Sequence, residues 1–142
     1  MNKDIVDIRL SKRASDIANR FREILFFPDA ISVAKLGFAY KLTKTSETEI
    51  LGFLMLSERK KDDRFDSNGN NYAGASIDQG GRMSKVITTK FPDCDIPHQY
   101  IRLLMDAGLC ELGEKISSLD DFKIFLKTFN SQFGHFAGTE LS

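Results

Sequence analysis

The chain has 142 residues, of which 42% are hydrophobic and 12 are phenylalanine, so a single domain can bury an apolar core without disulfides or metals. Lys and Arg total 20, and Asp and Glu total 20. The zero net charge excludes a uniformly basic nucleic-acid binder, although not a local basic patch. No stretch approaches the ~20 apolar residues that span a bilayer. Because the first residues, MNKDIVDIRLSK, lack the apolar core of a signal peptide, we expect a protein of the cytoplasm without a membrane segment.

A short strand and an amphipathic helix are predicted at the N-terminus. Val6, Ile8 and Leu10 alternate with polar residues, which is the period of a half-buried strand. Ser11 suits the N-cap position of a helix. Apolar residues then recur at helical spacing over residues 12–25, and charged residues take the opposite face.

A second helix is predicted over about residues 30–41. Pro28 ends the first helix and Asp29 can cap the second. The second helix is apolar over most of its circumference, so we expect it to be buried in a core or in an oligomer interface. Gly37 within it costs ~1 kcal/mol against alanine, which is acceptable where two helices must pack closely.

The middle of the chain is predicted to be largely irregular. An apolar run at residues 50–56 fits either a strand or a helix. Residues 57–82 are rich in Gly, Asn, Ser and Asp, which predicts a long mobile loop unless a partner orders it. A short strand is predicted around residues 85–89.

Two further helices are predicted towards the C-terminus, one over residues 98–107 that Gly108 ends and one around residues 122–129. We expect residues 1–130 to form one helical domain and residues 131–142 to form a flexible tail. The predicted fold is mainly α: a strand and two helices in ribbon-helix-helix-like order, a long loop, a short strand or hairpin, and two C-terminal helices.

The strand–helix–helix order is the most informative feature for function. In ribbon-helix-helix proteins, strands of two subunits pair and enter the major groove of DNA. Here Asp7 and Arg9 would face outward. Basic side chains available for phosphates are Lys3, Lys12, Arg13, Arg20 and Arg22. A strand packed on its own domain fits the same pattern equally well, because Asp7 suits a DNA groove poorly.

Other residues with chemical potential form no complete site in the sequence. The turn at residues 78–82 offers backbone N–H groups to a phosphate, but it lacks the spacing and the lysine of a P-loop. Cys94, Asp95 and His98 resemble half of a metal site, and a second pair of ligands is missing. Nothing fixes a catalytic geometry. We therefore expect no metal, no cofactor and no enzymatic activity.

Three segments resemble DndE, a small protein of bacterial DNA phosphorothioation systems. They are Ile8-Arg9-Leu10-Ser11-Lys12 with its helix, residues 32–42 (SVAKLGFAYKL) and residues 100–112 (YIRLLMDAGLCEL). Together they cover about a third of the chain and consist of apolar and small residues rather than catalytic signatures. The zero net charge departs from the pattern of this family, and residues 57–90 have no counterpart in it.

The resemblance implies a helical, oligomeric accessory protein that acts beside the enzymes that place sulfur in the DNA backbone. It implies binding of duplex or nicked DNA through Arg9, Lys12, Arg13 and Arg20, with Lys35 on the second helix as a further candidate. We therefore predict a non-catalytic DNA-binding accessory subunit of a bacterial DNA-modification or anti-phage defence complex, which self-associates through the second helix.

Two alternatives remain open from the sequence. The first is an adaptor whose Gly- and Asn-rich loop binds an enzyme partner rather than DNA. The second is a ribbon-helix-helix transcriptional repressor, which would prefer a palindromic DNA site.

Overall fold

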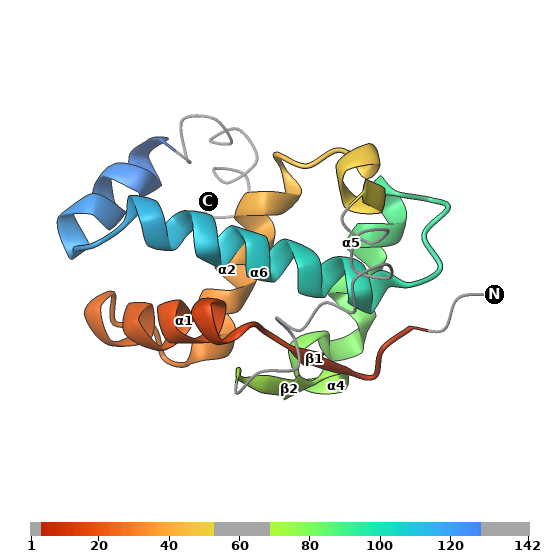
Figure 1. The fold of residues 1–142 in the computed structure, drawn as a ribbon, viewed down its shortest axis with the longest axis horizontal. Helices are drawn as coiled ribbons and strands as arrows, with labels where there is room; N and C mark the ends of the chain where they lie inside the picture. Colours follow the sequence, from red (N-terminus) through yellow and green to blue (C-terminus); the bar gives the residue numbers. More distant parts are fainter. Residues whose placement is uncertain (1–3, 53–68, 129–142) are drawn as a thin grey trace.

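The structure, a computed structural model, describes residues 4–52 and 69–128 and is mainly helical (Figure 1). Its elements are β1 (Asp7–Arg9), α1 (Lys12–Ile24), α2 (Ala30–Leu42), β2 (Asn71–Ala73), α4 (Gly74–Ile77), a 3-10 turn (Gln79–Gly81), α5 (Arg82–Lys90) and α6 (Pro97–Lys115). Residues 47–52 and 119–128 are also helical. This order confirms the predicted mainly α fold and its strand–helix–helix start.

Side-chain caps begin α1 and α2 at the predicted residues. Ser11 Oγ accepts a hydrogen bond from the backbone N–H of Ala14 at 3.1 Å. Asp29 Oδ1 accepts one from the backbone N–H of Ser32 at 2.8 Å. Each cap satisfies a donor that the first turn of a helix leaves without a partner. Because α1 begins at this register, Ala14 and Phe21 are buried and the basic residues of α1 lie on its outward face.

Helices α2 and α6 cross in the centre of the fold (Figure 1), and Gly37 and Gly108 meet at the crossing. A Cβ atom on Gly108 would lie 2.0 Å from the carbonyl oxygen of Gly37, so only hydrogen atoms fit at this crossing. The predicted role of Gly37 in close helix packing is confirmed. The predicted end of a helix at Gly108 is wrong, since α6 continues to Lys115. Gly108 allows α2 and α6 to pack closely and does not end the helix.

Helix α2 buries much of its apolar surface within its own chain. The buried residues are Val33, Ala34, Gly37, Phe38 and Tyr40. They pack into one apolar core with residues of α1, α5 and α6. Burial in this core explains why the helix is apolar over most of its circumference. Self-association through α2 remains a prediction.

Strand β1 pairs antiparallel with β2 of the same chain, with Ile8 opposite Tyr72. Ile8 and Leu10 are fully buried, as their alternation predicted. Val6 was predicted on the same buried face, but it precedes the strand and is 78% exposed. In a ribbon-helix-helix dimer the two copies of this strand would pair with each other. In this fold, two copies of β1 could pair only through the edge of β1 that does not face β2, or after β2 is displaced.

Part of the predicted loop at residues 57–82 is ordered. Strand β2, the single-turn helix α4 and the 3-10 turn lie within it. Asn70 and the strand residues that follow gain backbone hydrogen bonds to the segment that precedes α1, for example from the N–H of Leu10 to the carbonyl of Asn70 at 2.9 Å. The rest of the predicted loop, up to residue 68, and the predicted tail at residues 131–142 lie outside the described residues.

The predicted strand at residues 85–89 is instead part of helix α5. The β-branched residues of this segment favour a strand locally, but tertiary contacts decide the outcome. Asp78 Oδ1 accepts hydrogen bonds from the N–H groups of Met83 at 2.7 Å and Ser84 at 3.3 Å in the first turn of α5. Ile87 is fully buried and α5 packs on α6.

The two remaining helical segments are residues 47–52 and 119–128. The apolar run at residues 50–56 is helical where the structure describes it, as part of residues 47–52. The predicted last helix begins at residue 119, and Ser118 Oγ caps it by accepting a hydrogen bond from the N–H of Asp121 at 3.1 Å. In the described ranges, no helix combines the length and the apolar character needed to cross a membrane.

Candidate functional site

Three of the five predicted DNA-binding residues line one groove. The groove has a volume of about 580 Å³ and lies between α1 and the C-terminal end of α6. Its lining residues are Lys12, Arg13, Asp16, Ile17, Arg20 and Gly113. The residues from α1 share one face because positions four apart in a helix lie one turn apart. The structure therefore brings Lys12, Arg13 and Arg20 together as the helical periodicity predicted.

Acidic side chains accompany two of these three cations. Lys12 Nζ lies 3.0 Å from Asp16 Oδ2, and the Arg13 guanidinium lies 3.1 Å from Glu114 Oε1. The Lys12 and Arg13 side chains are 62% and 64% exposed. Ion pairs this exposed contribute only ~0–1 kcal/mol, so phosphate oxygens can replace the carboxylates at low cost. Arg20 instead donates to the carbonyl oxygen of Gly113 at 3.5 Å.

The other two predicted residues lie outside this groove. Arg9 is half-buried in β1, opposite Asn71. Lys35 is exposed on α2. The pKa of Asp29 is lowered chiefly by the hydrogen bonds from the backbone N–H and hydroxyl of Ser32, and the charge of Lys35 adds to this effect. Lys35 is thus near the start of α2, separate from the groove residues.

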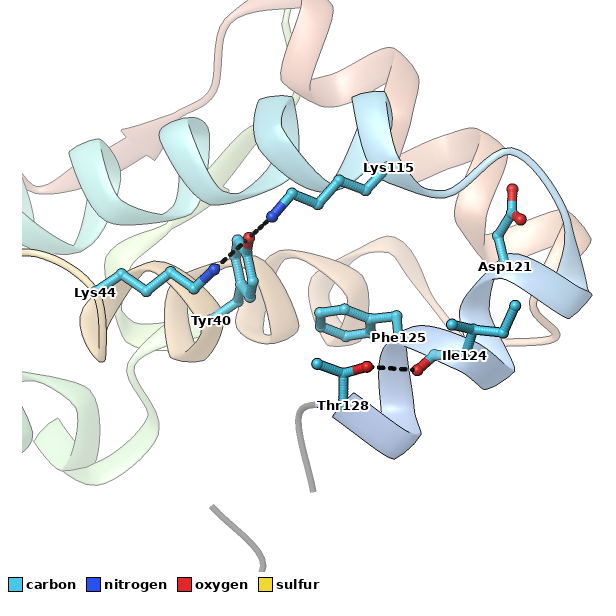
Figure 2. Close-up of a pocket in the computed structure, with 7 residues that line it drawn as sticks. All are labelled: Tyr40, Lys44, Lys115, Asp121, Ile124, Phe125 and Thr128. Carbon is cyan, nitrogen blue, oxygen red and sulfur yellow. Dashed lines mark hydrogen bonds between the residues drawn. The ribbon is translucent and has the colours of Figure 1, made fainter. Parts of the chain in front are cut away.

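A second pocket, which no sequence pattern predicted, lies between the ends of α2 and α6 and the helix of residues 119–128 (Figure 2). Its volume is about 370 Å³, and it is lined by Tyr40, Lys44, Lys115, Asp121, Ile124, Phe125 and Thr128. Lys44 Nζ and Lys115 Nζ donate hydrogen bonds to Tyr40 Oη at 2.9 and 2.7 Å. The four-residue spacing of Tyr40 and Lys44 could have indicated that these two side chains meet. Lys115 is 75 residues beyond Tyr40, so no local pattern predicts its contact with the hydroxyl.

The Tyr40 hydroxyl is held between two groups that only donate hydrogen bonds. Burial acts most strongly on its pKa and raises it, but the hydrogen bonds and charges of Lys115 and Lys44 together outweigh burial and leave the pKa lowered. The hydrogen bond to Tyr40 in turn raises the pKa of Lys115. These two shifts agree, since a phenolate and an ammonium stabilise each other. Tyr40 is therefore the tyrosine best placed to carry a negative charge.

Aromatic packing fixes the position of the Tyr40 ring. The rings of Tyr40 and Phe125 meet edge to face, with centroids 5.5 Å apart. The ammonium group of Lys44 also lies 4.3 Å from the centroid of the Tyr40 ring, within the range of a cation–π contact. The helix of residues 119–128 thus supplies an apolar wall beside the two lysines (Figure 2).

The turn at residues 78–82 and the residues Cys94 and His98, which the sequence offered for phosphate or metal binding, are engaged within the fold. The carboxylate of Asp78 accepts hydrogen bonds from the first turn of α5, so it occupies the N–H groups that follow the glycine turn. His98 Nε2 lies 3.1 Å from Asp78 Oδ2, and His98 Nδ1 lies 3.2 Å from the carbonyl oxygen of Ile5. Burial is the main cause of the raised pKa of the Cys94 thiol. Across residues 4–52 and 69–128, no group of three or more His, Cys, Asp or Glu residues is placed to hold a metal ion.

Comparisons with models of protein families, with curated proteins and with solved structures found no match for this chain.

Proposed function

We propose that the protein is a non-catalytic accessory subunit that binds DNA through the outward face of α1, in a bacterial DNA-modification or anti-phage defence complex. The observation that carries this proposal is the convergence of Lys12, Arg13 and Arg20 on one exposed groove. The complex itself is inferred from the DndE-like segments of the sequence, and DNA binding does not depend on that inference.

Duplex DNA fits this groove through its phosphates rather than its bases. Arg13 and Arg20 have planar guanidinium groups, which can bind a phosphate with two parallel hydrogen bonds. Asp16 and Glu114 lower the positive charge of the groove, so we expect modest affinity. Because such binding releases counterions, it weakens steeply with salt.

The test is a salt titration of duplex DNA binding by fluorescence anisotropy. The variant Lys12→Gln/Arg13→Gln/Arg20→Gln should bind more weakly and with a shallower dependence on salt, since the logarithmic slope falls by ~0.9 for each phosphate that the protein no longer neutralises. The matched control removes three exposed cations elsewhere, Arg82→Gln/Lys85→Gln/Lys123→Gln. Equal decreases in affinity for the two variants would contradict the assignment to α1, because they would reflect net charge alone.

A protein-binding role is a second candidate, favoured by Phe26. Its backbone is in the left-handed region with φ of 61°, and its side chain is 80% exposed. A non-glycine residue there costs ~1–2 kcal/mol, and an exposed phenylalanine gives no burial in return. Contact with a partner protein would bury this ring.

The variant Phe26→Asn tests this second role without disturbing the fold, because asparagine tolerates a left-handed backbone. Affinity purification from the native host should recover a stoichiometric partner with the original chain and lose it with the variant. Recovery of the same partner with both chains would exclude a contact through Phe26.

A further inference from the structure

The pocket beside Tyr40 gathers two positive charges around one hydroxyl group. Lys44 follows α2 and Lys115 ends α6, yet both ammonium groups point at Tyr40 Oη (Figure 2). In the part of the chain that the structure describes, neither lysine forms a salt bridge. The negative charge of Glu111 helps to raise the pKa of Lys115, but the Glu111 carboxylate forms its ion pair with Lys41.

Two like charges that share one acceptor repel each other, and an anion placed between them relieves that repulsion. Each ammonium group has three N–H donors and uses one of them on Tyr40. Both lysines are exposed, so a ligand can reach them from solvent. The remaining donors can therefore bind an anionic group at the mouth of the pocket.

We propose that this pocket binds a small phosphate monoester, with the phosphate between Lys44 and Lys115 and the organic group against Ile124 and Phe125. A phosphate monoester carries about −1.5 to −2 charges near neutral pH, which balances two lysines better than a single carboxylate does. The proposal goes beyond DNA binding by α1 and does not depend on it.

The apolar wall explains why an ester is preferred to free phosphate. Ile124 lines the pocket beside Phe125, and its side chain is 65% exposed, so an organic group can pack on it from solvent. The volume of about 370 Å³ lies near the lower end of the ~300–1,000 Å³ that is typical of ligand pockets. It has room for a phosphate and a group of the size of one ring.

Asp121, which also lines the pocket, determines how an anionic ligand is oriented in it. Its carboxylate accepts hydrogen bonds from the backbone N–H and the hydroxyl of Ser117 at 3.0 and 2.8 Å, and the former is the main cause of its lowered pKa. It is a negative charge in the first turn of the last helix. Because it repels phosphate, the ligand binds with its phosphate towards the lysines.

Phenyl phosphate is the probe for a calorimetric titration, with inorganic phosphate, benzoate and phenol as comparisons. The chain should bind phenyl phosphate most tightly, inorganic phosphate and benzoate more weakly, and phenol not at all. The variant Lys44→Gln/Lys115→Gln should bind phenyl phosphate at least about tenfold more weakly, as expected for the removal of charge-assisted hydrogen bonds. The control Arg82→Gln/Lys85→Gln removes the same charge from α5 and should bind normally.

Tyrosinate absorbance provides a second readout. A phosphate between the lysines competes with the Tyr40 phenolate, so saturating phenyl phosphate should shift the ionisation of Tyr40 to higher pH. Absence of phenyl phosphate binding, or unchanged affinity in the double lysine variant with its circular dichroism intact, would overturn the proposal. The variant Lys12→Gln/Arg13→Gln should retain phenyl phosphate binding, which separates this pocket from the α1 groove.

Discussion

The carbonyl group of Gly37 in α2 lies directly against the backbone of Gly108 in α6. A Cβ atom at Gly108 would lie 2.0 Å from that oxygen and 3.0 Å from the Gly37 Cα. This contact sets the distance between the two helices that form the centre of the core. It therefore also positions the C-terminal end of α6, which contributes to the α1 groove through Gly113 and to the Tyr40 pocket through Lys115.

Gly108→Ala should destabilise the protein, although alanine is normally the better helix residue by ~1 kcal/mol. The added methyl group overlaps backbone that has no free rotation, so we expect a loss of about 3 kcal/mol in the free energy of unfolding. Urea denaturation measures this loss. Gly52→Ala is the matched control, because a Cβ there meets nothing within 4 Å. A stable Gly108→Ala variant would contradict the tight crossing.

Asp106→Ala should destabilise the protein by about 2–3 kcal/mol, because charged hydrogen bonds to buried donors are among the strongest. The buried Asp106 carboxylate accepts hydrogen bonds from the backbone N–H of Ser11 at 2.7 Å and from its hydroxyl at 3.0 Å. It thereby ties the start of α1 to the middle of α6. Thermal unfolding should show this loss, whereas Asp16→Ala on the exposed face should change stability little.

Alkaline titration should resolve the tyrosines one by one, since the chain has three Tyr and no Trp. The pKa of Tyr40 is lowered from 10.0, whereas burial raises the pKa of Tyr72 and raises that of Tyr100 to about 12. Ultraviolet absorbance should show one tyrosine that ionises first, and Tyr40→Phe should remove that step. A first step that survives in Tyr40→Phe would contradict the role of the two lysines.

These shifts also set the sign of the dependence of stability on pH. Because the folded pKa of Tyr40 is lowered, its phenolate stabilises the folded state as the pH rises towards 10.0 and above. Tyr100 has the opposite effect, since its contribution is complete below pH 10.0 and is lost as the pH rises towards about 12. Tyr40→Phe should therefore lose more stability relative to the original chain at alkaline pH than at neutral pH, where it loses only the hydrogen bonds of the neutral hydroxyl. Denaturation at neutral and alkaline pH compares the two chains.

Glu114→Gln should strengthen duplex DNA binding if α1 is the DNA-binding face. The substitution frees Arg13 from its carboxylate partner and raises the charge of the groove by one. We expect a gain of about threefold to tenfold at low salt, with a steeper dependence on salt. Asp93→Asn, an exposed change outside the groove, is the control for net charge. Equal gains from both variants would count against the groove.

Local patterns in the sequence determined the elements that rest on local hydrogen bonds and periodicity. Ser11 and Asp29 cap helices at the predicted residues because a cap needs only its own side chain and the N–H groups of the next turn. The shared face of Lys12, Arg13 and Arg20 follows in the same way from helical spacing. These features could be predicted without knowledge of the rest of the chain.

Tertiary contacts decided the features that join distant parts of the sequence. Residues 85–89 form a helix rather than a strand because Asp78 caps that helix and Ile87 packs in the core. Gly108 lies within α6 because it faces Gly37, although its residue type favours a helix end.

The charges of the two candidate sites also depend on the tertiary structure. Glu114 reaches Arg13, and Lys115 reaches Tyr40, only once α6 packs against α1 and α2. The sequence by itself therefore determined which helices form at the N-terminus and which of their faces is basic. Only the tertiary structure decided which carboxylates neutralise that face and where a second pair of cations meets, because charges act through distance in space rather than separation along the chain.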